Sequence, residues 1–178
     1  LQGETDQFSP ELYCDNHPID QPRTAEEGYH LTEDLVDQAI GMIRSQKSAV
    51  PERPFFLYLC TSAPHRPCEV RPHFVKGASQ AGDRGDMVVL FDWVVGQVVH
   101  ALERTGAAGN ILVIATSDNG ARLTCANGES YGHKSNGNWR GQKADIWDGG
   151  HREPFIARWP GRIAPGTECE APVCLGDF

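Results

Sequence analysis

The sequence predicts an α/β fold in which a mostly parallel sheet is flanked by helices. Two short apolar runs, 53–60 and 111–116, have the length and the aromatic or β-branched content of buried strands. A long helical pattern lies between them, and a third strand-like run at 154–161 follows a polar, glycine-rich connection. Strands that alternate with helices over long connections are typical of parallel sheets, because parallel neighbours require a crossover.

The composition is that of a globular chain with a sizeable core. Of the 178 residues, 39% are hydrophobic and 22% are charged, which suits a single domain. The net charge of −8 argues against a nucleic-acid partner, because binding phosphates requires clustered Lys and Arg. It does not exclude a small anionic substrate, since a few local cations outweigh distant negative charge. No apolar run approaches the ~18 residues of a membrane span, so none is predicted.

The first half of the chain contains a lead-in, a helix and a strand. Residues 1–29 are polar, include three prolines and follow no sustained period, so we expect an extended, loop-rich segment. Residues 31–44 repeat apolar side chains at helical spacing, and Thr32 precedes two acids that suit the positive end of the helix dipole. The aromatic-rich run 53–60 then predicts a strand.

A second helix precedes the remaining strands. The range 85–106 ends at Gly106, a usual helix terminator, and its apolar side chains recur at steps of three and four, as an amphipathic helix requires: Met87, Phe91, Val94, Val98 and Leu102. The strand 111–116 follows, then a Gly-, Asn- and Ser-rich span from 117 to 150, then the strand 154–161.

Two predicted strands end in loops that could carry chemistry. His65 follows the first strand, and Asp118 and Asn119 follow the second. Ligands of open α/β sheets bind beyond the carboxyl ends of the strands. If these strands are parallel neighbours, the three side chains emerge on one rim. Asp118 and Asn119 offer the oxygen ligands that Ca²⁺ and Mg²⁺ prefer; the alternative is a plain turn, which the same residue types favour.

Other candidate residues have similar alternatives. His65 lies between two prolines that stiffen its loop, which suits proton transfer or anion binding but also describes a rigid surface turn. Lys143 lies in a glycine-rich segment where Trp139 and Trp147 are expected to anchor the chain against the core. It would contact a sulfate or phosphate oxygen, or be a solvated lysine. His133 is a candidate substrate contact or part of a turn.

Four consecutive blocks carry a family resemblance. They are "PFFLYLCTSAPHRP", "GDMVVLFDWVVGQVVHALERTG", "ILVIATSDNG" and "GHKSNGNWRGQKADIWDGGHREPFIARWPGRIAPGT". In order and spacing they resemble the type I sulfatases (arylsulfatase-like) of the alkaline phosphatase-like superfamily. The resemblance implies that residues 30–178 are the central part of a sulfatase catalytic domain, preceded by the lead-in 1–29, with a partial alkaline phosphatase-like α/β core.

The resemblance also implies roles for single residues. Asp118 and Asn119 correspond to metal ligands, usually for Ca²⁺, with Mg²⁺ as the alternative. His65 corresponds to the residue that bonds the sulfate ester or its leaving oxygen, and Lys143 to the residue that contacts a sulfate oxygen. Gln142 replaces a commoner glycine in this block, which leaves the lysine in place.

None of the cysteines in the chain is expected to supply the nucleophile of the family. Formylglycine arises in a Cys/Ser-X-Pro-X-Arg motif, and none of the six cysteines begins one: after Cys60, for example, the proline comes two positions too late. The paired aspartates of the family's metal site are not found either. We therefore expect about half of a sulfatase site, an inactive isolated chain, and unpaired sheet edges that invite self-association.

The implied function is hydrolysis of a small-molecule or glycan sulfate ester by the parent protein. Two alternatives remain at this point: a phosphodiesterase or phosphonate hydrolase of the same superfamily, and an inactive fragment that binds sulfated glycans. The cysteines have no CxxC spacing, so neither a zinc motif nor a redox compartment follows from them.

Overall fold

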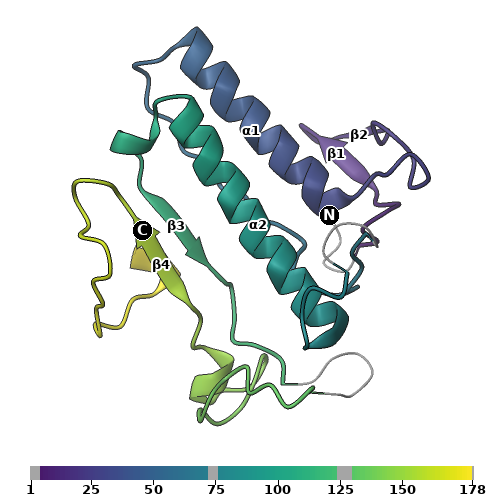
Figure 1. The fold of residues 1–178 in the computed structure, drawn as a ribbon, viewed down its shortest axis with the longest axis vertical. Coiled ribbons are helices and arrows are strands. Elements are labelled where there is room, and N and C mark those ends of the chain that lie inside the picture. Colours follow the sequence, from purple (N-terminus) through teal and green to yellow (C-terminus); the bar gives the residue numbers. More distant parts are fainter. Residues whose placement is uncertain (1–4, 72–75, 124–129, 178) are drawn as a thin grey trace.

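The computed structural model describes residues 5–71, 76–123 and 130–177. Two long helices lie side by side, and a two-stranded ribbon runs along the second helix (Figure 1). A second small ribbon lies near the N-terminus. The helices and strands are α1 (Leu31–Ala49), α2 (Gly82–Arg104), β1 (Leu12–Cys14), β2 (His17–Ile19), β3 (Val113–Thr116) and β4 (Phe155–Arg158). Short 3-10 turns lie at Ala108–Asn110, Asp148–Gly150 and Leu175–Asp177.

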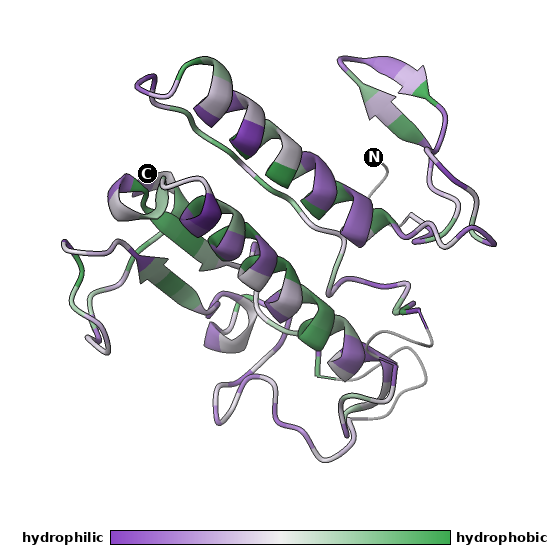
Figure 2. Cartoon of the chain, turned by 45° about the horizontal axis from the view of Figure 1, so that its top comes forward, coloured by the Kyte–Doolittle hydropathy of each residue, from purple (hydrophilic) through white to green (hydrophobic). Residues whose placement is uncertain are grey.

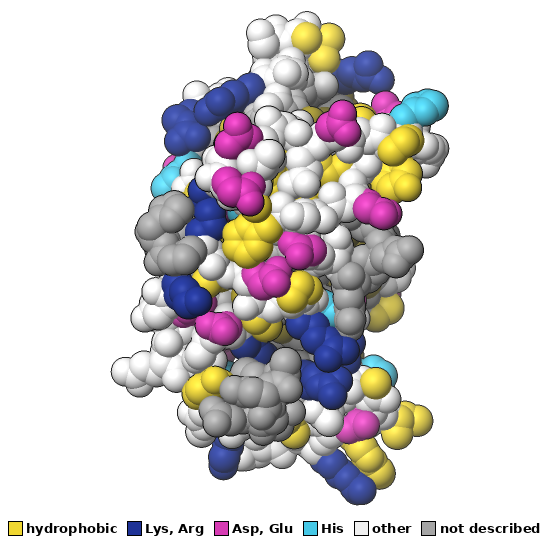
Figure 3. Space-filling model, turned by 90° about the vertical axis from the view of Figure 1, so that its right-hand side faces the viewer, with side chains coloured by type: hydrophobic (Ala, Val, Ile, Leu, Met, Phe, Trp, Pro, Cys, Tyr) yellow, Lys and Arg dark blue, Asp and Glu magenta, His cyan; other side chains and the backbone are white. Residues whose placement is uncertain are grey.

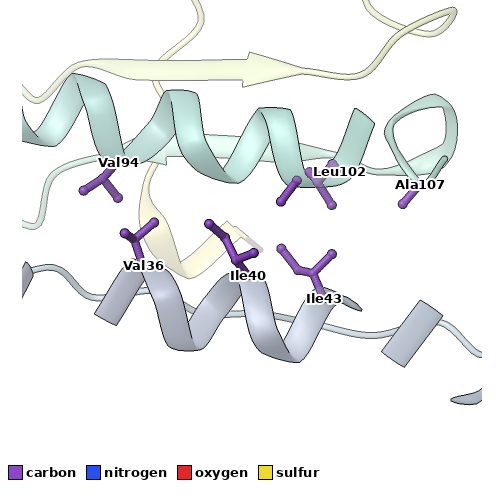
Figure 4. Close-up of a cluster of buried hydrophobic side chains, with 7 residues drawn as sticks. Val36, Ile40, Ile43, Val94, Leu102 and Ala107 are labelled. Carbon is purple, nitrogen blue, oxygen red and sulfur yellow. The ribbon is translucent and has the colours of Figure 1, made fainter. Parts of the chain in front are cut away.

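The core lies between the two helices. Side chains at helical spacing on α1 face those of α2 (Figure 4), and the buried set is Val36, Ile40, Ile43, Val94, Ala101, Leu102 and Ala107. Burying each large aliphatic side chain stabilises the fold by about 1.5–3 kcal/mol. The apolar stripes predicted for both helices are thus confirmed. A second cluster joins Met87 and Leu90 of α2 to Ala63 and Val70, which fixes the loop that contains His65.

The helix α2 also has the length and apolar composition of a membrane span. It is the one helix within the described ranges that is long and apolar enough to cross a bilayer, with a mean hydropathy of 1.3. A core helix of a globular protein can have the same length and composition, and α2 packs against α1 through the buried cluster. Asp92 and His100 interrupt the apolar side chains of α2, so the helix contains no unbroken apolar run of membrane-spanning length.

The predicted strand 53–60 is extended but is not a strand in the structure. Its side chains alternate: Phe55, Leu57 and Leu59 pack against the helical core, whereas Phe56 is 90% and Tyr58 is 78% exposed. No backbone hydrogen bond joins 54–60 to another described segment. The extended course of the predicted strand is therefore confirmed, but its expected burial holds on one face only. The ladder that defines a strand is absent among the described residues, because its partner would have to come from elsewhere.

The pairing of β3 also differs from the prediction. β3 pairs with β4 in antiparallel register, from Val113 opposite Arg158 to Thr116 opposite Phe155, and not with residues 53–60. The described parts of the polar connection, 117–123 and 130–150, form a lobe between β3 and β4, which pair as antiparallel neighbours. Both strands are among the most apolar parts of the chain (Figure 2). All strand pairs within the described residues are antiparallel.

The N-terminal lead-in contains a hairpin where an extended loop was expected. β1 and β2 pair antiparallel, and the two residues between them, Asp15 and Asn16, have φ of 49° and 66°. Two consecutive left-handed residues suit the right-handed twist of a tight hairpin, and Asp and Asn tolerate this conformation best after glycine. The turn chemistry was present in the sequence, but the flanking strands are too short for a clear alternation.

A buried polar network attaches the lead-in to the core. The Thr32 hydroxyl donates to Gln7 Oε1 at 3.1 Å, and α1 begins one residue before Thr32, with His30 at the N-cap position. Arg71 forms a two-pronged ion pair with Glu33 and donates to the Gly28 carbonyl at 3.0 Å. Because Arg71 follows the His65 loop, this network holds that loop against the start of α1.

Candidate active site

His65 and Lys143 contact each other although they lie 78 residues apart in the sequence. Lys143 Nζ is 3.3 Å from His65 Nε2, and the other ring nitrogen, Nδ1, is 2.8 Å from the Arg66 carbonyl oxygen. A carbonyl oxygen only accepts, so Nδ1 carries the hydrogen. Nε2 is then left with a lone pair that accepts from the lysine ammonium. The structure thus brings together two residues that were predicted separately.

Backbone hydrogen bonds place Lys143 opposite His65. The Lys143 amide donates to the Ala121 carbonyl at 3.1 Å, and the Gly120 amide donates to the Gly150 carbonyl at 2.9 Å. A Cβ on Gly120 would overlap the Gly149 carbonyl, so only glycine permits this close approach. The chain that leaves β3 is therefore tied directly to the loop that carries Lys143.

Asn136 is a site-building residue that sequence reasoning missed. It is 8% exposed, and its Nδ2 donates to the carbonyl oxygens of Ala121 (3.1 Å) and Gly141 (2.9 Å). A single amide thereby joins the segment after β3 to the segment before Lys143. Its position in a Gly- and Asn-rich span signalled a loop, but nothing in the sequence showed which carbonyls it meets.

Asp118 and Asn119 lie directly after β3, as predicted, and their side-chain oxygens are available. The Asp118 carboxylate is exposed and accepts no hydrogen bond from the described residues. Asn119 Nδ2 donates to the Gly120 carbonyl at 3.1 Å. The side-chain oxygen of Asn119, Oδ1, accepts no hydrogen bond from the described residues. One carboxylate and one carbonyl-type oxygen fit a hard cation. They are two of the six to eight oxygens that Ca²⁺ takes, and no cluster of three or more His, Cys, Asp and Glu lies in 5–71, 76–123 or 130–177.

Lys143 joins the two loops that were expected on one rim. Its amide donates to the Ala121 carbonyl, just after Asp118 and Asn119, and its ammonium contacts His65. The segment after β3 and the loop that contains His65 are therefore brought together, although residues 53–60 and β3 are not hydrogen-bonded neighbours. On the extended segment, the Tyr58 pKa is raised above its ordinary value, first by a hydrogen bond and charge interaction with Cys60.

His133 lies apart from the other candidates. It is exposed and its amide donates to the Ser130 carbonyl at 2.9 Å. Its turn packs against the start of α2, where Arg84 Nη2 donates to Ser135 Oγ at 3.4 Å. Among the described residues, no hydrogen bond joins His133 to His65 or Lys143.

The expected anchoring of Trp139 and Trp147 in the core is wrong. Their exposed fractions are 47% and 46%, and each indole stacks under an arginine. Glycine carbonyls and amides hold the 139–150 segment in place, so the indoles are not needed as anchors. They form a surface beside the candidate site.

Solved structures define the class of fold to which this arrangement belongs. The crystal structure of the PsFucS1 sulfatase from Pseudoalteromonas sp. matches with a TM-score of 0.64 at 32% identity, covering 83% of this chain and 27% of that one. The crystal structure of Ps i-CgsB matches with a TM-score of 0.70 at 26% identity, covering 86% and 32%. The predicted α/β sulfatase core is thus confirmed, and this chain holds part of it.

The chain belongs to the sulfatase family, whose model, "Sulfatase", matches residues 4–173. Steryl-sulfatase of Rattus norvegicus is 42% identical over 145 residues, which are 80% of this chain and 24% of that protein. N-acetylgalactosamine-6-O-sulfatase of Bacteroides thetaiotaomicron is 33% identical over 141 residues, covering 76% and 27%. The chain thus spans about a quarter of these curated relatives. Members of the family are generally metal-dependent.

Proposed function

We propose that the protein carrying this chain is a sulfuric ester hydrolase and that the chain supplies about half of its active site. The observation that carries the proposal is the contact of 3.3 Å between Lys143 Nζ and His65 Nε2. An ammonium and an imidazole from distant segments meet at one point, which suits an anionic ester whose leaving oxygen needs a proton. Residues 30–178 are the central part of the catalytic domain, and 1–29 lead into it.

Lys143 and His65 have complementary roles in this proposal. The Lys143 ammonium binds a sulfuryl oxygen as a point charge. His65 donates a hydrogen bond, and then a proton, from Nε2 to the leaving oxygen. In the observed arrangement Nε2 accepts from Lys143, so substrate binding must replace this contact: the ammonium turns to the ester, and Nε2 takes up a proton from solvent, which it then passes to the leaving oxygen. The Arg66 carbonyl keeps Nδ1 protonated and the ring oriented throughout.

Asp118 and Asn119 are the residues that would hold the metal. Their uncommitted oxygens suit Ca²⁺ or Mg²⁺, which when bound supplies positive charge beside the sulfuryl oxygens. Further ligands and a formylglycine nucleophile would come from outside these 178 residues. His133, on the exposed turn 130–134, is proposed as a substrate contact.

The substrate is proposed to be a small-molecule or glycan sulfate ester. The names of the relatives specify a steryl sulfate in one case and a sulfated amino sugar in the other, and one solved neighbour, Ps i-CgsB, holds a neocarrahexaose. The unpaired extended segment with exposed Phe56 and Tyr58 supports self-association of the isolated chain, since such surfaces seek a partner.

The test uses the complete polypeptide that carries this chain and an aryl sulfate. We expect hydrolysis that a chelator abolishes and Ca²⁺ restores, and an Asp118→Ala variant that needs far more Ca²⁺ for the same rate. Activity indifferent to both the chelator and Asp118→Ala would overturn the metal role. Faster turnover of an aryl phosphodiester than of the sulfate would identify a phosphodiesterase instead.

A further inference from the structure

Two arginine–tryptophan stacks lie on the loop that carries Lys143. Arg140 Cζ is 3.6 Å from the centre of the Trp147 ring, and Arg152 Cζ is 3.7 Å from that of Trp139. The two tryptophans are 47% and 46% exposed, and both arginines are exposed as well. Figure 3 shows basic and apolar side chains together at the lower end of the molecule, where this lobe lies in Figure 1.

The backbone holds the two stacks beside Lys143. The Gly149 amide donates to the Arg140 carbonyl at 2.8 Å. This bond joins the segment that begins with Trp139 and Arg140 to the segment that contains Trp147 and Arg152. Gly141 has a φ of 87°, and a Cβ there would lie 2.8 Å from Trp147 Cβ, so glycine is required for the loop to fold back. Lys143 is two residues further along the same loop. The residues of the two stacks therefore lie on both sides of the proposed ester-binding residue along this loop.

Each stack combines two kinds of recognition. An indole offers a flat apolar face on which the C–H face of a sugar ring packs. A guanidinium stacked on an aromatic ring keeps its N–H edge free for a carboxylate or sulfate, which it binds with two parallel hydrogen bonds. Keeping two indoles half in solvent costs hydrophobic stabilisation, so a ligand that covers them regains it.

We propose that Trp139, Arg152, Trp147 and Arg140 form a subsite for an anionic saccharide, a sugar that carries sulfate or carboxylate groups beyond the ester held by Lys143. The inference rests on the proposed function in taking Lys143 as the ester-binding residue. A steryl sulfate fits less well, because it carries a single anionic group and would leave two guanidinium groups desolvated without a partner.

Direct binding tests the subsite without any turnover. The full 178-residue chain is titrated with a chondroitin 6-sulfate tetrasaccharide while the indole N–H signals of its four tryptophans are followed by NMR. We expect the signals of Trp139 and Trp147 to move and those of Trp93 and Trp159 to stay. Trp159 is an internal control, since Arg162 stacks on it at 5.1 Å. Equal movement at Trp159, or none at Trp139 and Trp147, would overturn the proposal.

Matched variants distinguish binding at the two stacks from a general effect of positive charge on the surface. Arg140→Gln and Arg152→Gln should each weaken tetrasaccharide binding by about tenfold, the upper range for one stacked or aromatic contact, whereas Arg162→Gln should leave it unchanged. An unaltered Trp93 indole signal shows that the variants are folded. Equal losses in all three variants, or tighter binding of estrone sulfate than of the tetrasaccharide, would contradict an anionic-saccharide subsite.

The outcome also separates this inference from the proposed function. In the complete polypeptide, the same two substitutions should raise the KM for a sulfated saccharide about tenfold, whereas Arg162→Gln should leave both this KM and the kcat for an aryl sulfate unchanged. Tetrasaccharide binding at the two indoles without any sulfate hydrolysis would sustain the subsite and reject the hydrolase. Hydrolysis of the sulfate ester with a KM for the saccharide that is unchanged in both variants would sustain the hydrolase and reject the subsite.

Discussion

Lys143 donates to His65 across 3.3 Å, while His65 Nδ1 faces the Arg66 carbonyl at 2.8 Å. The imidazole is therefore held from both sides, and its tautomer is set by its neighbours. The contact links two parts of the chain that share no helix or strand pairing. It also gives a role to Asn136, Gly120 and Gly150, because their hydrogen bonds hold the loop that carries Lys143 against the segment after β3.

Asn136 should be essential for this arrangement. Asn136→Ala removes two hydrogen bonds from a buried amide and leaves the Ala121 and Gly141 carbonyls without that donor, so we expect a loss of about 2 kcal/mol in unfolding free energy. Urea denaturation of the chain measures it. Asn138→Ala, at an exposed position of the same loop, is the control. A loss of similar size in both variants would show that the bonds of Asn136 are not special.

Calcium should bind the isolated chain only weakly. Asp118 and Asn119 supply two oxygens, whereas protein sites with full coordination reach Kd values of about 10⁻³ M or tighter. Calorimetry with Ca²⁺ should therefore show no saturable heat at micromolar concentrations. Saturation in that range that disappears in Asp118→Asn would mean that other described residues complete the site, contrary to this account.

His30 should make the chain less stable in acid. Its ring is fully buried, and burial lowers its pKa, opposed by the bond to the Glu69 carbonyl and reinforced by the charge of Arg71. The unfolded chain then binds the proton more tightly than the folded chain. Its contribution to stability is complete above the ordinary imidazole pKa of about 6.5 and is lost as the pH falls toward the folded value.

Denaturant midpoints between pH 7.5 and 5.5 measure this effect. His30→Gln should flatten the dependence on pH, and His100→Gln, at an exposed position of α2, should retain it. The same slope in His30→Gln as in the unaltered chain would assign the titration to another group.

Phe56 should drive self-association of the chain. It is 90% exposed on an extended segment whose backbone bonds no other described segment, the combination that favours strand addition. Phe56→Ser should shift the sedimentation coefficient toward that of a monomer. Met42→Ser, which removes a side chain that is 60% exposed on α1, should have no such effect. Association that is equal in both variants would exclude this segment as the contact.

The parts of the fold that depend on local pattern were predictable. Ile40 and Val94 lie on apolar stripes of helical period, and both stripes form the core. Strand pairing is not local, so the aromatic-rich apolar run that contains Phe55, Phe56 and Leu57 indicated an extended segment without showing its partner. The antiparallel return of β4 to β3 depended on the lobe between them, which no period describes.

The site residues show the same difference between what a local motif indicates and what depends on long-range contacts. His65 and Lys143 were each identified from their own motif, and the structure added their contact. Asn136 was missed because its function depends on two carbonyls that the fold brings to it. Trp139 and Trp147 were expected to anchor their segment against the core, whereas both are about half exposed and each lies under an arginine.

The central claim is that His65 and Lys143 act as one unit on a sulfate ester, and a double-mutant cycle tests it most directly. The measurement is kcat/KM for an aryl sulfate with the complete polypeptide, as the unaltered protein, His65→Gln, Lys143→Met and the double variant. We predict that each single change costs about 10²–10⁴-fold and that the double variant loses at most about tenfold more than the worse single variant, because coupled groups are not additive. Losses that multiply in the double variant, or single variants with unaltered kcat/KM, would contradict the account.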